Sequence, residues 1–152
     1  MKRTLSLILV SLMLATALVG CGDGGGYKDG TYKATYDDFD EHGWKAYVDI
    51  TITDGEISDV DFDYVNEEGD LKSKDEEYNT LMKEKSGSSP EEFSPALEQQ
   101  LIEKQNVKEI DNITGATHSV ENFKKLADAA LKNAKSGNTE EVLVEQEKAE
   151  EN

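Results

Sequence analysis

The sequence predicts a small, single α+β domain in which an antiparallel sheet packs against three helices. Apolar and polar side chains alternate from Thr31 to Tyr64, as in strands with one buried face, whereas apolar residues recur at helical spacing from Ser73 onward. Strands that come first and helices that come later indicate this class rather than an alternating α/β fold. The length of 152 residues fits one such domain.

Three runs of residues predict the strands of this sheet. The first covers residues 31–36, and the second covers 44–53, in which every second side chain is apolar. Asp54-Gly55 then predicts a two-residue hairpin turn, because both positions must accept a positive φ. After the turn, Ile57 is out of phase with the apolar residues that follow it, so we predict a β-bulge near residues 58–59.

Start signals place the three helices. The first is expected to begin at the capping box of residues 73–76, and the second at Ser94-Pro95. A short strand is expected at residues 107–110, and Ser119 is the expected N-cap of the last helix. The inward-facing residues of the three helices are, in order, Tyr78, Leu81 and Met82; Leu97, Leu101 and Ile102; and Val120, Phe123, Leu126, Ala127, Ala130, Leu131 and Ala134.

The N-terminus has the features of a signal peptide. A positively charged start, Met1-Lys2-Arg3, precedes an apolar run over residues 5–19, which is shorter than the roughly 20 residues that span a bilayer. The run ends in Leu18-Val19-Gly20-Cys21, which resembles the lipobox of bacterial lipoproteins, in which the cysteine is lipidated and becomes the new N-terminus. The alternative is an ordinary secreted protein that is cut near Gly20 and keeps a free thiol.

These features divide the chain into four parts. Residues 1–20 are the predicted lipoprotein signal peptide, and residues 21–26 are a Gly-rich tether that begins at the lipidated Cys21. The folded domain is expected over residues 27–135. Residues 136–152 are an acidic tail that we expect to be mostly disordered.

Composition excludes several classes of function. Removal of residues 1–20 leaves 14 basic against 33 acidic residues, a net charge of −19, which argues against nucleic-acid binding. One cysteine and two histidines exclude a disulfide framework and a Cys/His zinc site, and no metal site is predicted. Asp38, Asp40 and Gly43 faintly resemble a calcium loop, but His42 stands where an oxygen ligand belongs, so a solvated loop is the preferred interpretation.

One segment is unusual, the hydroxyl-rich run Asp111-Asn112-Ile113-Thr114-Gly115-Ala116-Thr117-His118-Ser119. A loop that leads into a helix accounts for Ser119 as a cap. It does not account for two threonines that bracket Gly115-Ala116, nor for the aspartate three residues before them. We therefore treat this run as the candidate functional motif.

The pattern Asp-x-x-Thr-Gly-Ala-Thr resembles the flavinylation motif of FMN-binding domains. These domains occur in subunits of the sodium-pumping NADH:quinone reductase and the related Rnf complex, and in single-domain lipoproteins of Gram-positive bacteria. The segments at residues 28–32 and 54–57 also look like this family, and the resemblance covers about residues 27–135. It implies that Thr117 carries FMN through a phosphoester, attached by a Mg²⁺-dependent flavin transferase that uses FAD as donor.

The resemblance assigns the other site residues only in part. Asp111, Thr114, Gly115 and Ala116 match recognition residues of the motif, whereas His118 and Ser119 occupy more variable positions. An esterified phosphate at Thr117 would precede the expected last helix by two residues, where free N–H groups favour an anion. The residues that could touch the isoalloxazine ring are Tyr78 and Met82, although core packing is the preferred interpretation of both.

The expected function is that of an electron carrier rather than a catalyst, and no catalytic residue is assigned. The protein would be anchored to the membrane through Cys21 on its extracytoplasmic face and would pass electrons from a membrane donor to an extracellular acceptor. The identities of both redox partners do not follow from the sequence. The alternative is a non-redox surface lipoprotein, an adhesin or ligand-binding module, which would be colourless when purified.

Overall fold

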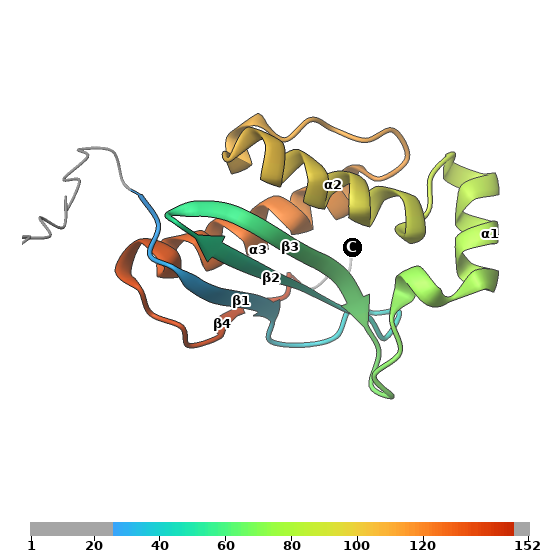
Figure 1. The fold of residues 1–152 in the computed structure, drawn as a ribbon. Helices are drawn as coiled ribbons and strands as arrows, with labels where there is room; N and C mark the ends of the chain where they lie inside the picture. The colour runs from blue at the N-terminus through green and yellow to red at the C-terminus, as the bar shows by residue number, and fades with distance from the viewer. Residues whose placement is uncertain (1–25, 148–152) are drawn as a thin grey trace, which may run out of the picture.

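The computed structural model describes residues 26–147 and shows a sheet covered on one face by two helices, with a third helix at one end (Figure 1). The strands are β1 (Gly30–Tyr36), β2 (Lys45–Thr53), β3 (Glu56–Val65) and β4 (Val142–Val144). Their order in the sheet is β3-β2-β1-β4. The helices are α1 (Glu76–Ser86), α2 (Pro90–Lys104) and α3 (Thr117–Ser136), with short 3-10 turns η1 (Lys72–Lys74) and η2 (Val107–Glu109). The predicted α+β class is confirmed.

The hairpin between β2 and β3 forms as predicted. Asp54 and Gly55 both have positive φ, 54° and 79°, as a two-residue turn of this kind requires. Thr51 pairs with Asp59, and the next residue, Ile52, pairs with Ile57, so one extra residue lies in β3. This is the predicted bulge, and it returns the apolar residues of both strands to one face.

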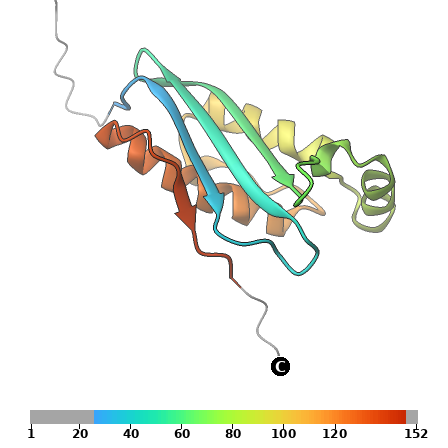
Figure 2. The same ribbon diagram turned by 90° about the horizontal axis from the view of Figure 1, so that it is seen from below.

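The core lies between this face of the sheet and helices α2 and α3. The apolar stripe of α3 is buried over its whole length, as expected, and Leu97 and Leu101 of α2 are fully buried. The opposite face of the sheet has no helix over it (Figure 2). Within residues 26–147, no helix is both long and apolar enough to cross a membrane.

The predicted starts of helices α1 and α2 are wrong. Helix α1 is capped by Asp75, whose carboxylate accepts a hydrogen bond from the Tyr78 N–H at 2.9 Å, because the Ser73 hydroxyl is instead bonded to a carboxylate of β3. Helix α2 begins five residues earlier than expected, at Ser89-Pro90 rather than Ser94-Pro95, and Pro95 lies inside the helix at an exposed position. Pro90 suits the first turn of a helix for the same reason that Pro95 was expected to, because an N–H at that position has no partner within the helix.

Two further expectations differ from the structure. Leu81 is 47 % exposed, because α1 lies at the periphery and packs little of its surface. Residues 107–109 form the turn η2 rather than a strand, and the Asn106 side chain caps it.

The acidic tail is not wholly disordered. Its one apolar run, Val142–Val144, forms β4 and pairs in parallel with the open edge of β1, so the sheet is mixed rather than antiparallel throughout. An unpaired strand edge offers hydrogen-bonding groups to such a run. The signal peptide, the tether up to residue 25 and Cys21 lie outside the described residues, and their assignments stay predictions.

Candidate functional site

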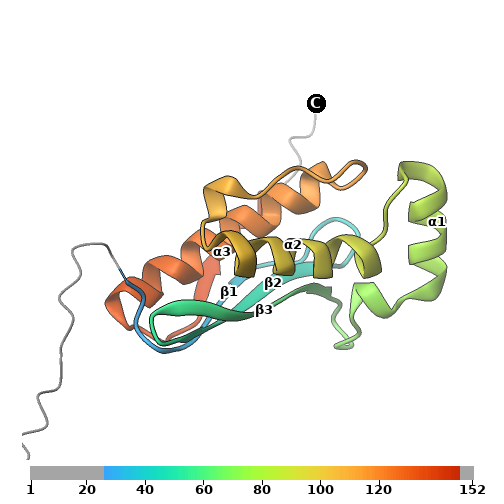
Figure 3. The same cartoon turned by 45° about the horizontal axis from the view of Figure 1, so that its top comes forward.

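The motif of residues 111–119 forms the connection between η2 and α3 and the start of α3, at the end of the molecule where α1 lies (Figure 3). Gly115 fixes this connection against α1. It has φ of +80°, and a Cβ at this position would lie 2.1 Å from the carbonyl oxygen of Ser86, the last residue of α1. Both the backbone conformation and the close approach therefore require glycine.

The start of the motif is held by the end of α2. The Gln100 Oε1 accepts a hydrogen bond from the Asp111 N–H at 2.7 Å, and the Lys104 ammonium pairs with the Asp111 carboxylate at 2.5 Å. The hydrogen bond and charge of Lys104 lower the pKa of Asp111, which keeps this exposed carboxylate ionised at neutral pH. Asp111 thus acts as a fixed anchor for the loop.

Thr117 is the first residue of α3 and Ala116 is its N-cap, so the predicted N-cap, Ser119, is wrong by three residues. Ala116 precedes it and offers no side-chain cap. Thr117 is exposed, and its Oγ1 accepts a weak hydrogen bond from the Asn112 Nδ2 at 3.4 Å. The first N–H groups of α3 are thus open to an anion, and the helix dipole adds to the attraction.

Ser119 does not cap α3, because it already lies in the first turn and is buried. Its hydroxyl faces that of Tyr64, at the end of β3. One turn further along α3, the Asn122 Nδ2 donates to the Tyr64 hydroxyl at 3.2 Å, and the Tyr36 hydroxyl donates to the Asn122 Oδ1 at 2.9 Å. Burial raises the pKa of Tyr36 to about 12, so it remains a donor. This network joins the start of α3 to the sheet.

The remaining motif residues are at the surface. Thr114 and His118 are exposed, and the His118 Nδ1 lies 4.0 Å from the Glu121 carboxylate. The structure therefore presents a hydroxyl, an imidazole and free N–H groups to solvent at one helix end. Among residues 26–147 there is no group of three or more His, Cys, Asp or Glu side chains that could hold a metal ion.

A lysine surrounded by aromatic rings lies beside this network, and no pattern in the sequence predicts it. The Lys72 Nζ lies 4.5 Å from the ring centroid of Tyr78, 4.8 Å from that of Tyr64 and 5.4 Å from that of Trp44. We call these four residues the Lys72 cage. They come from η1, α1, β3 and the loop before β2, and no local pattern links positions so far apart.

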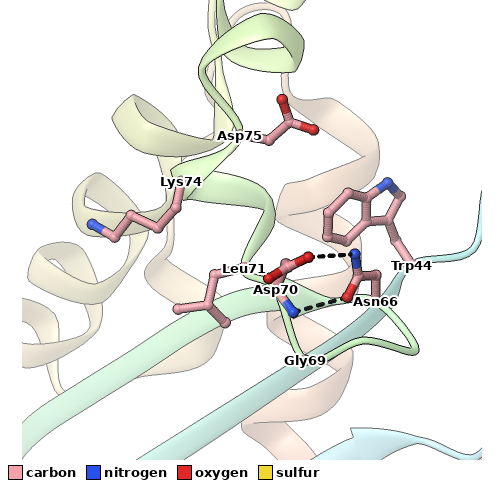
Figure 4. A pocket seen from close by; sticks show the side chains of 7 residues that line it. All are labelled: Trp44, Asn66, Gly69, Asp70, Leu71, Lys74 and Asp75. Atoms are coloured by element: carbon pink, nitrogen blue, oxygen red, sulfur yellow. Dashed lines mark hydrogen bonds between the residues drawn. The ribbon is translucent and has the colours of Figure 1, made fainter.

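Next to the cage is an open hollow of about 480 Å³ (Figure 4). Trp44 belongs to both, and the other residues that line the hollow are Asn66, Gly69, Asp70, Leu71, Lys74 and Asp75. The Asn66 and Asp70 side chains are hydrogen-bonded to each other across its floor. Of the two residues that the sequence suggested for ring contact, Tyr78 lies in the cage, whereas Met82 packs at the margin of the hydrophobic core.

A sequence model described as "FMN-binding domain" matches residues 42–132 of this chain. The chain belongs to the FMN-binding domain family. The match includes the hairpin, helices α1 and α2, most of α3 and the whole motif around Thr117. The resemblance that the motif indicated is therefore confirmed.

Two relatives are similar to this chain over most of its length. The "15 kDa lipoprotein" of Treponema pallidum (strain Nichols) is 39% identical over 133 residues, which is 88% of this chain and 94% of the relative. A crystal structure of a protein from Clostridium perfringens is 45% identical and superimposes with a TM-score of 0.77, covering 80% of this chain and 99% of that one. The TM-score shows that the two proteins share a fold, as expected at 45% identity.

The geometry of the site fits FMN. An uncapped helix start at Thr117 suits a phosphate group, since unpaired N–H groups and the helix dipole favour an anion there. The partly exposed Trp44 and Tyr78 of the cage and the adjacent hollow suit a flat ring system, because sites for small ligands combine apolar walls with a few polar groups. The motif and the cage lie at the same end of the domain, joined through Tyr64.

Proposed function

We propose that this FMN-binding protein is a membrane-anchored, extracytoplasmic electron carrier with FMN esterified to Thr117. The observation that carries the proposal is the position of the Thr117 hydroxyl, exposed at the uncapped first turn of α3. A hydroxyl there is open to a modifying enzyme, and its phosphoester would meet the free N–H groups of the helix. Gly115 and Ala116 are small, so the loop leaves space around the Thr117 hydroxyl.

The attachment reaction balances with FAD as the donor. The Thr117 Oγ1 bonds to the phosphorus of the FMN half, the pyrophosphate bond of FAD breaks, and AMP leaves. The hydroxyl proton must be removed by the Mg²⁺-dependent transferase, because among the described residues no carboxylate or imidazole is hydrogen-bonded to Thr117. This chain contributes the hydroxyl, a fixed loop and the anion-binding helix start.

When bound, FMN supplies the ability to take up and release one or two electrons. The residues of this chain hold it at one end of the domain, where redox partners can approach. A covalent link prevents loss of the cofactor outside the cell. Lipidation at Cys21 would hold the carrier near the membrane, and the lipoprotein name of the Treponema pallidum relative supports this part of the proposal.

The intact mass of the protein tests the attachment directly. Coexpression with an active flavin transferase should add the mass of one FMN less one water, and the gel band should fluoresce. Thr117→Ala should abolish both signals, whereas Thr80→Ala, at an exposed threonine of α1, should keep them. A flavin that stays covalently bound in Thr117→Ala contradicts the assignment. An unmodified wild-type protein, beside a control substrate that is modified, favours the non-redox surface lipoprotein.

Lipidation is tested separately in a bacterial host. Cells grown with a fatty-acid analogue that carries a chemical handle should label the wild-type protein on its N-terminal peptide. Cys21→Ala should remove the label without affecting flavin attachment, because the two modifications are on separate parts of the chain. Labelling that persists in this variant would show that the anchor is not at Cys21.

A further inference from the structure

We propose that Lys72 is the positioning residue for the flavin ring and that its ammonium stabilises the negative charge which the ring gains on reduction. The ring would lie against the Lys72 cage, beside the hollow that Trp44 borders (Figure 4). This inference rests on the proposed attachment of FMN at Thr117. It adds a site for the ring, which the motif does not provide.

The first argument is that Lys72 is a buried cation without an anion. The residue is 8% exposed, yet among residues 26–147 no carboxylate lies within 4.0 Å of its Nζ and the ammonium donates no hydrogen bond to a protein group. This is unusual in a chain that has 33 acidic and 16 basic residues. Partial removal of an unpaired charge from water is costly, and three aromatic faces offset only part of that cost. An anionic ligand would offset the rest.

The second argument is that the protein holds Lys72 in place from two sides. The Asn79 Nδ2, which is buried, donates to the carbonyls of Lys72, Ser73 and Asp75 at 3.3, 3.0 and 2.8 Å. The buried Asp63 carboxylate accepts from the Ser73 N–H at 3.1 Å and from the Ser73 hydroxyl at 2.5 Å. The turn η1 is therefore fixed before any cofactor binds, as expected of a preorganised site.

The third argument is the place of the cage relative to Thr117. Tyr64 faces Lys72 with its ring and reaches the first two turns of α3 with its hydroxyl. Helix α1 makes a second link, since Tyr78 lies in the cage and Ser86, at the other end of the helix, lies against Gly115. The start of α3 at Thr117 would bind the phosphate of FMN. The part of FMN beyond the phosphate, which ends in the ring, would then extend toward the cage. The hollow of about 480 Å³ is within the size range of small-ligand sites.

The charge balance explains what Lys72 would do. Uptake of two electrons and one proton by the oxidised ring leaves it with one additional negative charge. The Lys72 side chain is not consumed in this step. A fixed cation beside the ring favours the reduced form over the oxidised one, because charge interactions are stronger away from bulk water. The midpoint potential of the bound flavin should therefore be higher with Lys72 than without it.

Matched variants test this role in the flavin-loaded protein. Lys72→Met keeps the length of the side chain but removes the charge, and Lys72→Arg keeps the charge. Lys132→Met is the control, because Lys132 is an exposed residue of α3 that pairs with Asp128 at 2.8 Å, away from the cage. Intact mass gives the flavin content of each variant, and a dithionite titration gives its midpoint potential.

We expect full flavin content in all three variants and a lower potential in Lys72→Met alone. A tenfold loss of preference for the reduced form corresponds to about 30 mV for a two-electron couple. A fully loaded Lys72→Met with the wild-type potential overturns the role of Lys72 but leaves the attachment intact. A wild-type protein that gains no flavin overturns the proposed function instead.

A measurement on the wild-type fold covers the case in which Lys72→Met does not fold. Trp44 is the only tryptophan, so it gives a single indole N–H signal in an NMR spectrum. Signals of Trp44 and of the Lys72 side chain should shift between the loaded wild type and the unloaded Thr117→Ala, while those of Lys132 stay. Unchanged Trp44 and Lys72 signals would place the ring elsewhere and overturn the proposal.

Discussion

Gly115 makes the position of Thr117 depend on a contact with α1. Replacement by alanine would force a Cβ to within 2.1 Å of the Ser86 carbonyl oxygen, which is backbone and cannot rotate away. Gly43 is a matched control, because it has the same φ of +80° but nothing within 4 Å of a Cβ. We expect Gly43→Ala to lower the free energy of unfolding by about 1 kcal/mol through backbone strain alone. Gly115→Ala should cost about 2 kcal/mol more.

Urea unfolding of both variants measures this difference, and flavin attachment gives a second readout. Because the loop must shift to admit the new methyl group, Gly115→Ala should also be modified more slowly by the transferase. Gly43→Ala should be modified at the wild-type rate. Equal stability and equal modification of the two variants would show that the contact with Ser86 is not required.

Glu98 is a half-buried carboxylate that destabilises the fold at neutral pH. Its Oε1 accepts a hydrogen bond from the Phe62 N–H at 2.8 Å. Burial, the first cause, and the charges of Asp61, Asp63 and Asp59 nevertheless raise the pKa of Glu98. A raised pKa in the folded state means that the folded protein binds this proton more tightly than the unfolded chain. The contribution of Glu98 to stability therefore increases as the pH falls through the raised pKa.

Glu98→Gln should stabilise the protein, since the amide oxygen can still accept from Phe62 while the charge is lost. At pH 7 we expect a gain of up to about 1 kcal/mol in the free energy of unfolding. The gain should shrink as the pH is lowered from 7 to 4.5, because the carboxyl of the wild type takes up its proton as the pH falls through its raised pKa. Urea unfolding at both pH values measures it, with the exposed Glu103→Gln of the same helix as control. A gain that grows at low pH would contradict the charge argument.

At the scale of elements, β4 protects the outer edge of the sheet. It pairs with residues 34–36 of β1, and the Asp37 N–H donates to the Val144 carbonyl at 2.9 Å. Val142 and Val144 pack against the core, while Leu143 is 65% exposed. Removal of this strand would leave β1 with unpaired backbone groups on one side, which favours pairing between chains.

Deletion of residues 138–152 should lower the free energy of unfolding by about 1–2 kcal/mol, because several backbone hydrogen bonds and two partly buried valines are lost. The shortened protein should also self-associate, as light scattering would show. Deletion of residues 148–152 is the control, since it keeps β4. If both deletions unfold at the same urea concentration, the strand contributes nothing to stability.

The elements that the sequence predicted well are those whose signals are local. The turn at Asp54-Gly55, the bulge after it and the apolar stripe of α3 each depend on spacing within a few residues. The starts of α1 and α2 were misplaced because each helix has two possible start signals close together in the sequence. Contacts with residues far along the chain determine which of the two is used. Ser73 illustrates this, since its hydroxyl bonds to Asp63 in β3 rather than to the helix.

The site divides in the same way. The motif around Thr117 is contiguous, so the sequence identified it and only the exact helix start was wrong. The Lys72 cage combines four separate elements, and its lysine is the residue type least expected to be buried. Such a cluster becomes visible only when the folded chain brings its rings together.

At the scale of the whole molecule, charge is the dominant property. Without residues 1–20 the chain has a net charge of −19. Part of this charge lies on the face of the sheet that no helix covers (Figure 2), where Asp49 and Asp61 face each other across β2 and β3. Burial and the charge of Asp49 raise the pKa of Asp61, which reflects the concentration of acidic groups on this face. Such a field attracts cations and repels anions over about a Debye length.

We therefore expect the flavin-loaded protein to discriminate between redox partners by their charge. At low ionic strength, the reduced protein should transfer electrons to a cationic small-molecule acceptor faster than to an anionic one of similar potential. Addition of salt should slow the first reaction and accelerate the second, because screening weakens attraction and repulsion alike. Stopped-flow measurement of flavin reoxidation between about 10 and 300 mM salt, within which the Debye length falls below about 10 Å, tests this expectation. Salt-independent rates for both acceptors would mean that electrons leave through a surface on which the net charge has no influence.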